Sequence, residues 1–134
     1  MSEIKVDTLT GKTTAKTVTV TVGATATQSL EQGLVKAWGH SNHSANTIQD
    51  SFNITSITDD GTGLKDYNWT SSFGSANYVG ANGMGGNEGA TSNMRASSVN
   101  GVWTSSQAII KFSQSSSSGA DDVNALVMFI GDLA

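Results

Sequence analysis

The sequence contains no cysteine and no proline, and each absence narrows the possible structures. Without cysteine the chain has no disulfide framework and no thiolate metal site. Without proline, its strands must end at glycine, asparagine or aspartate. Basic charge is scarce as well, because Arg95 is the only arginine and the formal net charge is −4. No basic stripe is present to hold a phosphate backbone, so the sequence predicts no binding of nucleic acid.

Long apolar runs are missing too. No window approaches the roughly 20 apolar residues that a membrane-spanning helix needs, so membrane insertion is not expected. The first 17 residues lack the apolar core of a signal peptide. We therefore expect the protein to be made in the cytoplasm and to stay soluble.

What remains is typical of a β protein with many turns. Only 37% of the 134 residues are hydrophobic and 13% are charged, while serine, threonine, asparagine and 15 glycines make up much of the rest. Such residues suit strands and turns better than helices. The chain length is that of one domain with a short appendage.

The N-terminal part shows two different periods. The run TVTVTV at residues 17–22 alternates strictly and predicts a strand, which must pair with a second strand or a second copy to be stable. In residues 27–38, Leu30, Leu34 and Trp38 are spaced by four, which predicts a helix of about three turns. Its narrow apolar stripe suits either packing against copies of itself, as in a coiled coil, or packing across a sheet.

Residues 39–134 are predicted to form a distal β domain. Residues 39–50 read as a polar loop, and residues 51–73 as a hairpin with its turn at residues 59–63. In that hairpin Phe52 and Ile54 would share one face, and a bulge near Ser56 would bring Ile57 onto the same face. On the return strand, Lys65, Tyr67 and Trp69 would share one face. Residues 82–93 read as a glycine-rich surface loop. Residues 123–130 are apolar on both faces, as a strand central to a sandwich would be.

Candidate chemistry is weak throughout. Asp59 and Asp60 beside two glycines match neither a calcium loop nor a phosphate loop, and tight turns select the same residues. His40 and His43 belong to no zinc pattern and are expected to be exposed loop residues. Serine occurs in no G-x-S-x-G motif. We therefore predict no catalytic, cofactor or metal site, and we expect the tryptophans and tyrosines to be core residues rather than a sugar platform.

Several of these segments resemble one known module. The K-A-W triplet at residues 36–38, DSFNITSITDDGTG at residues 50–63, and the NWT and NY segments that follow are similar to tail-fibre-like, virion-surface structural proteins of marine bacteriophages, of the cyanophage and pelagiphage type. The resemblance covers residues 2 to about 78. It implies a mainly β structural protein of the virion, a short fibre or a head or tail decoration component, rather than an enzyme.

The resemblance also implies an assembly. Residues 1–38 would be the anchor and stem of a homotrimer, with a strand and a short helix, and residues 39–134 an antiparallel β-sandwich or jelly-roll-like domain. Other capsid or tail proteins of the phage would be its partners. The predicted trimer interface consists of Val18, Val20, Val22, Leu30, Leu34 and Trp38. The alternative is a fibre tip that binds a host-surface glycan for attachment, with a recognition loop that includes Asn82, Met84, Asn87 and Asn93.

Overall fold

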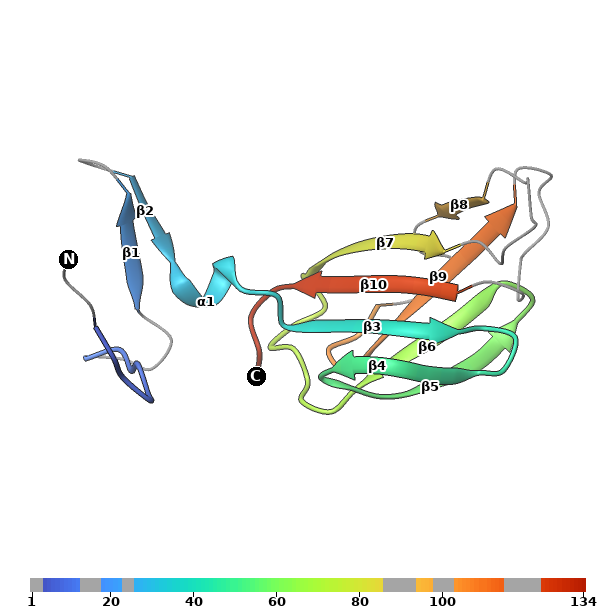
Figure 1. Cartoon of the computed structure of the whole chain (residues 1–134), viewed down its shortest axis with the longest axis horizontal. Coiled ribbons are helices and arrows are strands. Elements are labelled where there is room, and N and C mark those ends of the chain that lie inside the picture. The colour runs from blue at the N-terminus through green and yellow to red at the C-terminus, as the bar shows by residue number, and fades with distance from the viewer. Residues whose placement is uncertain (1–3, 13–17, 23–25, 86–93, 98–102, 115–123) are drawn as a thin grey trace. The chain divides into compact units, whose positions relative to one another are not determined.

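The chain forms two compact units, Met1–Leu34 and Val35–Ala134. The computed structural model describes residues 4–12, 18–22, 26–85, 94–97, 103–114 and 124–134 (Figure 1). Within this part, no helix is long and apolar enough to cross a membrane. The domain boundary expected from sequence, at residues 38 and 39, lies four residues beyond the division between the units.

The first unit contains a short hairpin. Strand β1 (Thr19–Val22) pairs antiparallel with β2 (Ala26–Ser29), and one helical turn, α1 (Leu30–Gly33), follows. The predicted strand is therefore confirmed, whereas the predicted three-turn helix over residues 27–38 is wrong. The Leu30 amide donates to the Val18 carbonyl at 2.7 Å, so strand pairing continues to the start of α1. Gly33 ends the turn, and glycine is a poor helix former.

The second unit contains two four-stranded antiparallel sheets. In the first, the strand order is β4-β3-β10-β7, with β3 (Ala37–Asn42), β4 (Thr47–Phe52), β7 (Val79–Gly85) and β10 (Asn124–Ile130). In the second, the order is β5-β6-β9-β8, with β5 (Ile54–Gly61), β6 (Leu64–Trp69), β8 (Met94–Ser97) and β9 (Gln107–Gln114). Strand β10, predicted as a strand from its sequence, lies between β3 and β7 in its sheet (Figure 1).

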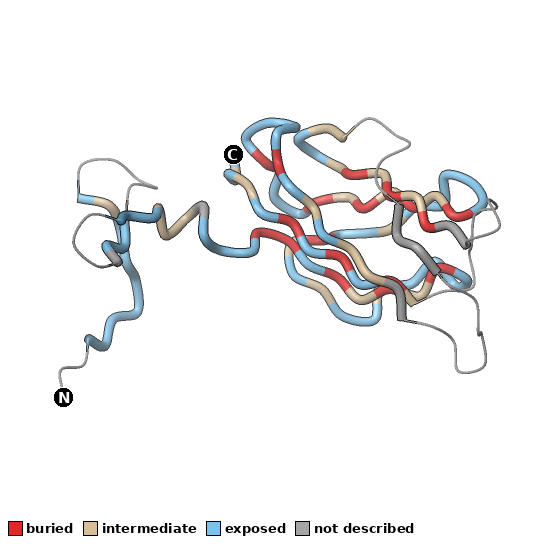
Figure 2. Tube along the Cα trace, turned by 90° about the horizontal axis from the view of Figure 1, so that it is seen from above, coloured by how far each residue is buried: buried red, intermediate tan, exposed pale blue. Residues whose placement is uncertain are grey.

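Side chains from both sheets enclose one core. Burial alternates along the strands, as in β6 and β10, so one face of each strand points inward. Figure 2 shows the buried residues gathered along the strands of the second unit, while none of the described residues of the first unit is buried. The buried hydrophobic residues are Ala37, Ile54, Tyr67, Trp69, Phe73, Tyr78, Ala108, Ile110, Phe112, Ala125, Val127 and Phe129.

An aromatic cluster fills one end of this core. Phe129 lies 4.7 Å from the ring of Trp69 and 5.8 Å from that of Trp103, and Tyr78 stacks on Trp103 at 4.9 Å. Gly80 belongs to this cluster, because a Cβ there would lie 2.8 Å from side-chain atoms of both Phe129 and Trp103. A larger residue at position 80 would therefore displace an aromatic ring.

One predicted loop forms two strands instead, and the described part of a second belongs to a strand. Residues 39–50, expected to be a loop, form most of β3 and β4 around a turn at residues 43–46. The inward-facing residues of β3 include Gly39 and Ser41, so no apolar alternation marks this strand in the sequence. In the predicted loop 82–93, residues 82–85 belong to β7 and pair with β10, and residues 86–93 lie outside the described residues.

The predicted hairpin is confirmed, but its start is not. Strands β5 and β6 pair as expected, with a register shift between Ile54 and Ser56. Phe52, however, ends β4 and is exposed, whereas Ile54 begins β5 and is buried. Asn53 separates them at φ 58°, a conformation that asparagine tolerates, and its side chain donates to the Ser71 carbonyl and accepts from the Ser71 amide. The chain thus passes from one sheet to the other at Asn53.

Candidate functional site

The predicted trimer-interface residues divide between the two units. In the first unit, Val20, Leu30 and Leu34 line a hollow of about 160 Å³, and Val20 and Leu34 are largely exposed. Val18 is half-buried, and the structure does not describe the side chain of Val22. Trp38 does not continue a helix from Leu34 but lies on β3 in the second unit. The interface itself stays a prediction.

The predicted recognition loop is only partly described. Asn82 lies on β7, and Met84 lies on the same strand, although its side chain is not described. Asn87 and Asn93 fall outside the described residues. Because Asn82 and Met84 are paired with β10, these two positions belong to a sheet rather than to a loop tip.

The outer surface of the β4-β3-β10-β7 sheet is unusually apolar. Six large hydrophobic side chains on its strands are exposed, by 37% to 72%. We call this surface the apolar outer face; it consists of Trp38, Phe52, Val79, Leu126, Met128 and Ile130. The prediction that β10 is apolar on both faces is correct, but only one of these faces is buried within the chain.

Strand register arranges this face in rows. One row crosses the whole sheet, from Phe52 through Trp38 and Met128 to Ala81. Beside it, His40 pairs with Asp50 on one side and with Leu126 on the other, and Leu126 pairs with Gly83. In these two rows the residues on β7 are small, Ala81 and Gly83, whereas Val79 farther along β7 is exposed.

The small residues leave a hollow in this face. It has a volume of about 280 Å³, and its lining includes Ala81, Gly83, Leu126 and Met128. By contrast, the outer surface of the β5-β6-β9-β8 sheet is largely polar along β5 and β6, where Ser56 pairs with Asn68 and Thr58 with Asp66. The two sheets thus present chemically different surfaces.

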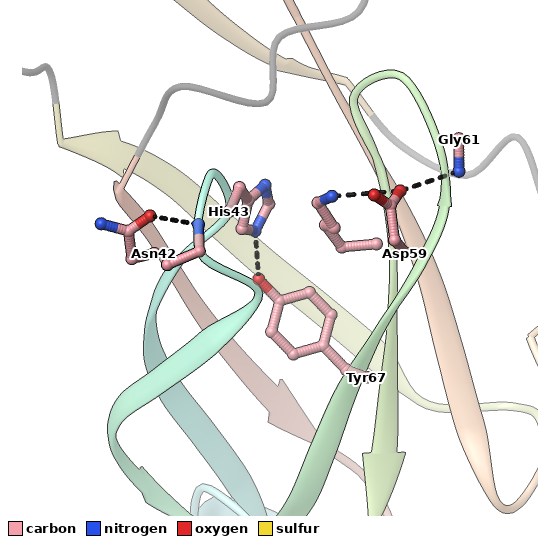
Figure 3. Close-up of polar contacts among 7 residues, drawn as sticks. Asn42, His43, Asp59, Gly61 and Tyr67 are labelled. Atoms are coloured by element: carbon pink, nitrogen blue, oxygen red, sulfur yellow. Dashed lines mark hydrogen bonds and ion pairs between the residues drawn. The ribbon is translucent and has the colours of Figure 1, made fainter.

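A buried polar cluster links the two sheets inside the core. The Tyr67 hydroxyl lies 2.8 Å from Nε2 of His43, as Figure 3 shows, and 2.9 Å from Oγ of Ser41. All three residues are almost fully buried, and the His43 ring packs edge-on against Phe112 at 4.5 Å. The prediction that His43 is an exposed loop residue is wrong, because the β3–β4 turn carries the ring inward over Tyr67.

Burial changes the acidity of both tyrosines. It raises the pKa of Tyr67 to about 12, against the opposing effect of the Ser41 hydrogen bond, and it also raises the pKa of Tyr78 to about 12. The Tyr78 hydroxyl donates to the carbonyls of Thr104 and Gln107, at 3.0 Å and 2.7 Å. In both cases the neutral phenol is the form that the core accommodates.

The alkaline absorbance titration should show this directly. Tyr67 and Tyr78 are the only tyrosines in the chain, so the phenolate signal reports them alone. Because their pKa values are raised in the folded state, they stabilise the fold fully below pH about 10, and this stability is lost as pH rises toward 12. We expect almost no phenolate at pH 10.5 in the native protein and a normal transition near pH 10 in denaturant. A native transition near pH 10 would contradict the buried placement of both rings.

The hairpin turn holds an ion pair rather than a ligand. Nζ of the buried Lys65 lies 3.1 Å from a carboxylate oxygen of Asp59 (Figure 3). The Gly61 amide donates to the same side chain at 3.0 Å, and this bond, followed by the Lys65 contact, lowers the pKa of Asp59. Gly61 and Gly63 both have positive φ, as the turn requires. Asp59 thus caps its own turn and neutralises a buried lysine.

Neither a metal centre nor a broad aromatic platform is present in the described part of the chain. Among the described residues, no three histidine, aspartate or glutamate side chains cluster closely enough to hold a metal ion. Of the tryptophans and tyrosines considered as a sugar platform, Tyr67, Trp69 and Tyr78 are buried and Trp103 is partly buried, which leaves Trp38 exposed. No family model matches the sequence, and no curated protein or solved structure shows significant similarity to it.

Proposed function

We propose that the chain is a structural protein of a bacteriophage virion, a short fibre or decoration component that assembles as a homotrimer through its N-terminal unit. The observation that carries the proposal is the composition of that unit. Among its described residues, β1 pairs with β2 alone, one helical turn follows, and Ile4, Val6, Leu9, Val20 and Leu34 are exposed. A lone two-stranded hairpin is marginal in water, so this unit needs other chains to cover it.

The resemblance to phage fibre modules supports the proposal that the covering chains are further copies of this chain. The segment that carries it, residues 50–63, ends in the β5–β6 hairpin. That resemblance implies a homotrimer that is attached to other capsid or tail proteins and located on the virion. We further propose that the second unit is a β-sandwich without catalytic activity. Because β3–β4, β5–β6 and β8–β9 each pair within one sheet, its topology favours stacked hairpins over a jelly roll built from two Greek keys.

Native mass spectrometry of a dilute sample tests the trimer. Three chains of 13.8 kDa give a species of about 41 kDa. The variant Leu34→Asp places a charge among the exposed apolar residues of the first unit and should yield the 13.8 kDa monomer. The matched control is Thr27→Asp, an exposed position on β2 outside the hollow that Val20, Leu30 and Leu34 line, and it should remain trimeric. A monomeric wild-type protein would refute the trimer.

Receptor binding is the second candidate function. The observation that favours it is the pair of exposed aromatic residues, Trp38 and Phe52, which are cross-strand partners beside His40 and Asp50. Aromatic faces flanked by polar side chains suit binding of a host-surface glycan. Adsorption of the purified protein to host cells, lost in Trp38→Ala and retained in Ser56→Ala, would support this function.

A further inference from the structure

We infer that the apolar outer face is a docking surface for a second copy of the same chain, in a two-fold symmetric, sheet-to-sheet contact. The inference concerns only the second unit and does not depend on the proposed trimer. Its first ground is the contrast between the two sheets. One outer surface is largely polar, as soluble surfaces are, whereas the other carries six exposed large hydrophobic side chains.

The area of this face fits a dimer contact. Side chains of about 150–250 Å² with these exposed fractions contribute roughly 500 Å² of apolar surface. A stable interface buries about 800 Å² on each partner, and roughly 65% of the centre of a homodimer interface is apolar. The apolar outer face therefore supplies about the apolar area that one partner of a standard homodimer needs.

The shape of the face is complementary to itself. Its longest row runs from Phe52 at one edge to Ala81 at the other, with Trp38 and Met128 between them. A two-fold axis parallel to the strands, passing between β3 and β10, lays β4 of one copy over β7 of the other. Phe52 of each copy then enters the hollow above Ala81 and Gly83 of its partner, and Trp38 packs on Met128.

Charge does not oppose this contact. On the four strands, the described titratable side chains of this face are His40 and Asp50, which are cross-strand neighbours at the β4 side. The same two-fold axis places the two Asp50 carboxylates at opposite edges of the contact, where Asp50 of one copy lies over Gly83 of the other. Like charges are thus kept apart, and both carboxylates remain near solvent.

A cysteine cross-link tests this geometry without natural thiols to interfere, because the chain contains none. In the full-length double variant Phe52→Cys with Ala81→Cys, mild oxidation should give a covalent dimer of two 13.8 kDa chains, about 28 kDa, on a denaturing gel. Within one chain the two positions are three strand spacings apart, about 14 Å, which is too far for a disulfide. The matched control, Ser56→Cys with Ala81→Cys, should stay monomeric on the gel. A ladder of larger products would show a head-to-tail contact and overturn the two-fold arrangement.

Sedimentation across a concentration series tests the energetics. Leu126→Lys should weaken self-association through this face by about 100-fold, since a two-fold contact contains the change twice. Ser56→Lys, the same charge on the other outer surface, should leave association unchanged. If the stem trimer also forms, the concentrated protein should contain species larger than one trimer, and Leu126→Lys should return it to single trimers whereas Leu34→Asp should leave dimers. The two contacts therefore fail separately.

Other occupants of the face would give different results. Two results together would overturn the inference. The first is that concentrated wild-type protein forms no larger assembly that the Leu126→Lys substitution abolishes, and the second is that the double variant Phe52→Cys with Ala81→Cys does not cross-link. Quenching of Trp38 fluorescence by a host-surface glycan under those conditions would assign the face to receptor binding instead. Circular dichroism of Leu126→Lys confirms folding, which we expect to be unchanged because Leu126 is half exposed.

Discussion

The substitution Phe129→Ala is expected to lower the free energy of unfolding by about 3–5 kcal/mol, the usual cost of removing a fully buried aromatic ring. Phe129 has no exposed surface and sits among the rings of Trp69, Tyr78 and Trp103. Its removal leaves a cavity between rings that come from separate segments of the chain, and such a cavity cannot easily close. Urea unfolding followed by tryptophan fluorescence measures this loss, because two of the contacting rings are themselves tryptophans.

The chain offers a matched control in Phe52→Ala. The deletion is chemically identical, but Phe52 is 51% exposed on the apolar outer face. Measured on dilute protein, where contacts between chains are minimal, it should cost less than about 1 kcal/mol. Equal losses for Phe129→Ala and Phe52→Ala would contradict the inward orientation of one face of the sheet and the outward orientation of the other.

Removing one oxygen atom should have the second-largest effect. Tyr67→Phe deletes the hydroxyl that contacts both His43 and Ser41, so two buried polar groups lose the same partner. Leaving a buried polar group unsatisfied costs about 1–3 kcal/mol, and we expect a loss in this range. Thermal unfolding of Tyr67→Phe beside wild type gives the value.

A double-mutant cycle separates this cluster from ordinary packing. The double variant Tyr67→Phe with His43→Leu has no imidazole that needs the hydroxyl as a partner. Its free energy of unfolding should therefore fall by less than the sum of the losses in the two single variants. The exposed hydroxyl of Ser56 provides the control, since Ser56→Ala should change stability by less than about 0.5 kcal/mol. Strict additivity at positions 43 and 67 would show that the two side chains do not interact.

Local features of the sequence were sufficient to predict the central hairpin. The turn residues Asp59, Gly61 and Gly63 mark its position, and the alternation of Lys65, Tyr67 and Trp69 marks its buried face. These signals operate within one hairpin, where turn chemistry fixes the register. For the same reason, the bulge near Ser56 was predictable from the phase of Ile57.

The helix prediction failed because its spacing is ambiguous. Residues four apart, such as Leu30, Leu34 and Trp38, lie on one face of a helix and equally on one face of a strand, since four is a multiple of two. The pairing of β2 with β1 and of β3 with β10 decides between these two possibilities, and β10 is far from β3 in the sequence. Trp38 consequently belongs to a sheet, and its place in a stem with Leu34 cannot rest on a shared helix.

The buried histidine was missed for a related reason. The inward positions leading to His43 are small or polar, Gly39 and Ser41, and resemble a loop when read alone. Ser41 and His43 can be buried because Tyr67, about 25 residues further along the chain, supplies their hydrogen-bonding partner. Only the tertiary arrangement of the two sheets reveals this, whereas the apolar character of both faces of β10 was readable from its sequence.

The proposal that this chain is a surface protein of a phage virion would be tested most directly by a cryo-electron microscopy reconstruction of the particle. The account predicts density for the chain on the particle surface, with three copies of residues 1–34 meeting at a three-fold axis and their exposed apolar side chains turned toward one another. Particles that lack the chain, or that hold it as separate single copies, would contradict the proposed function.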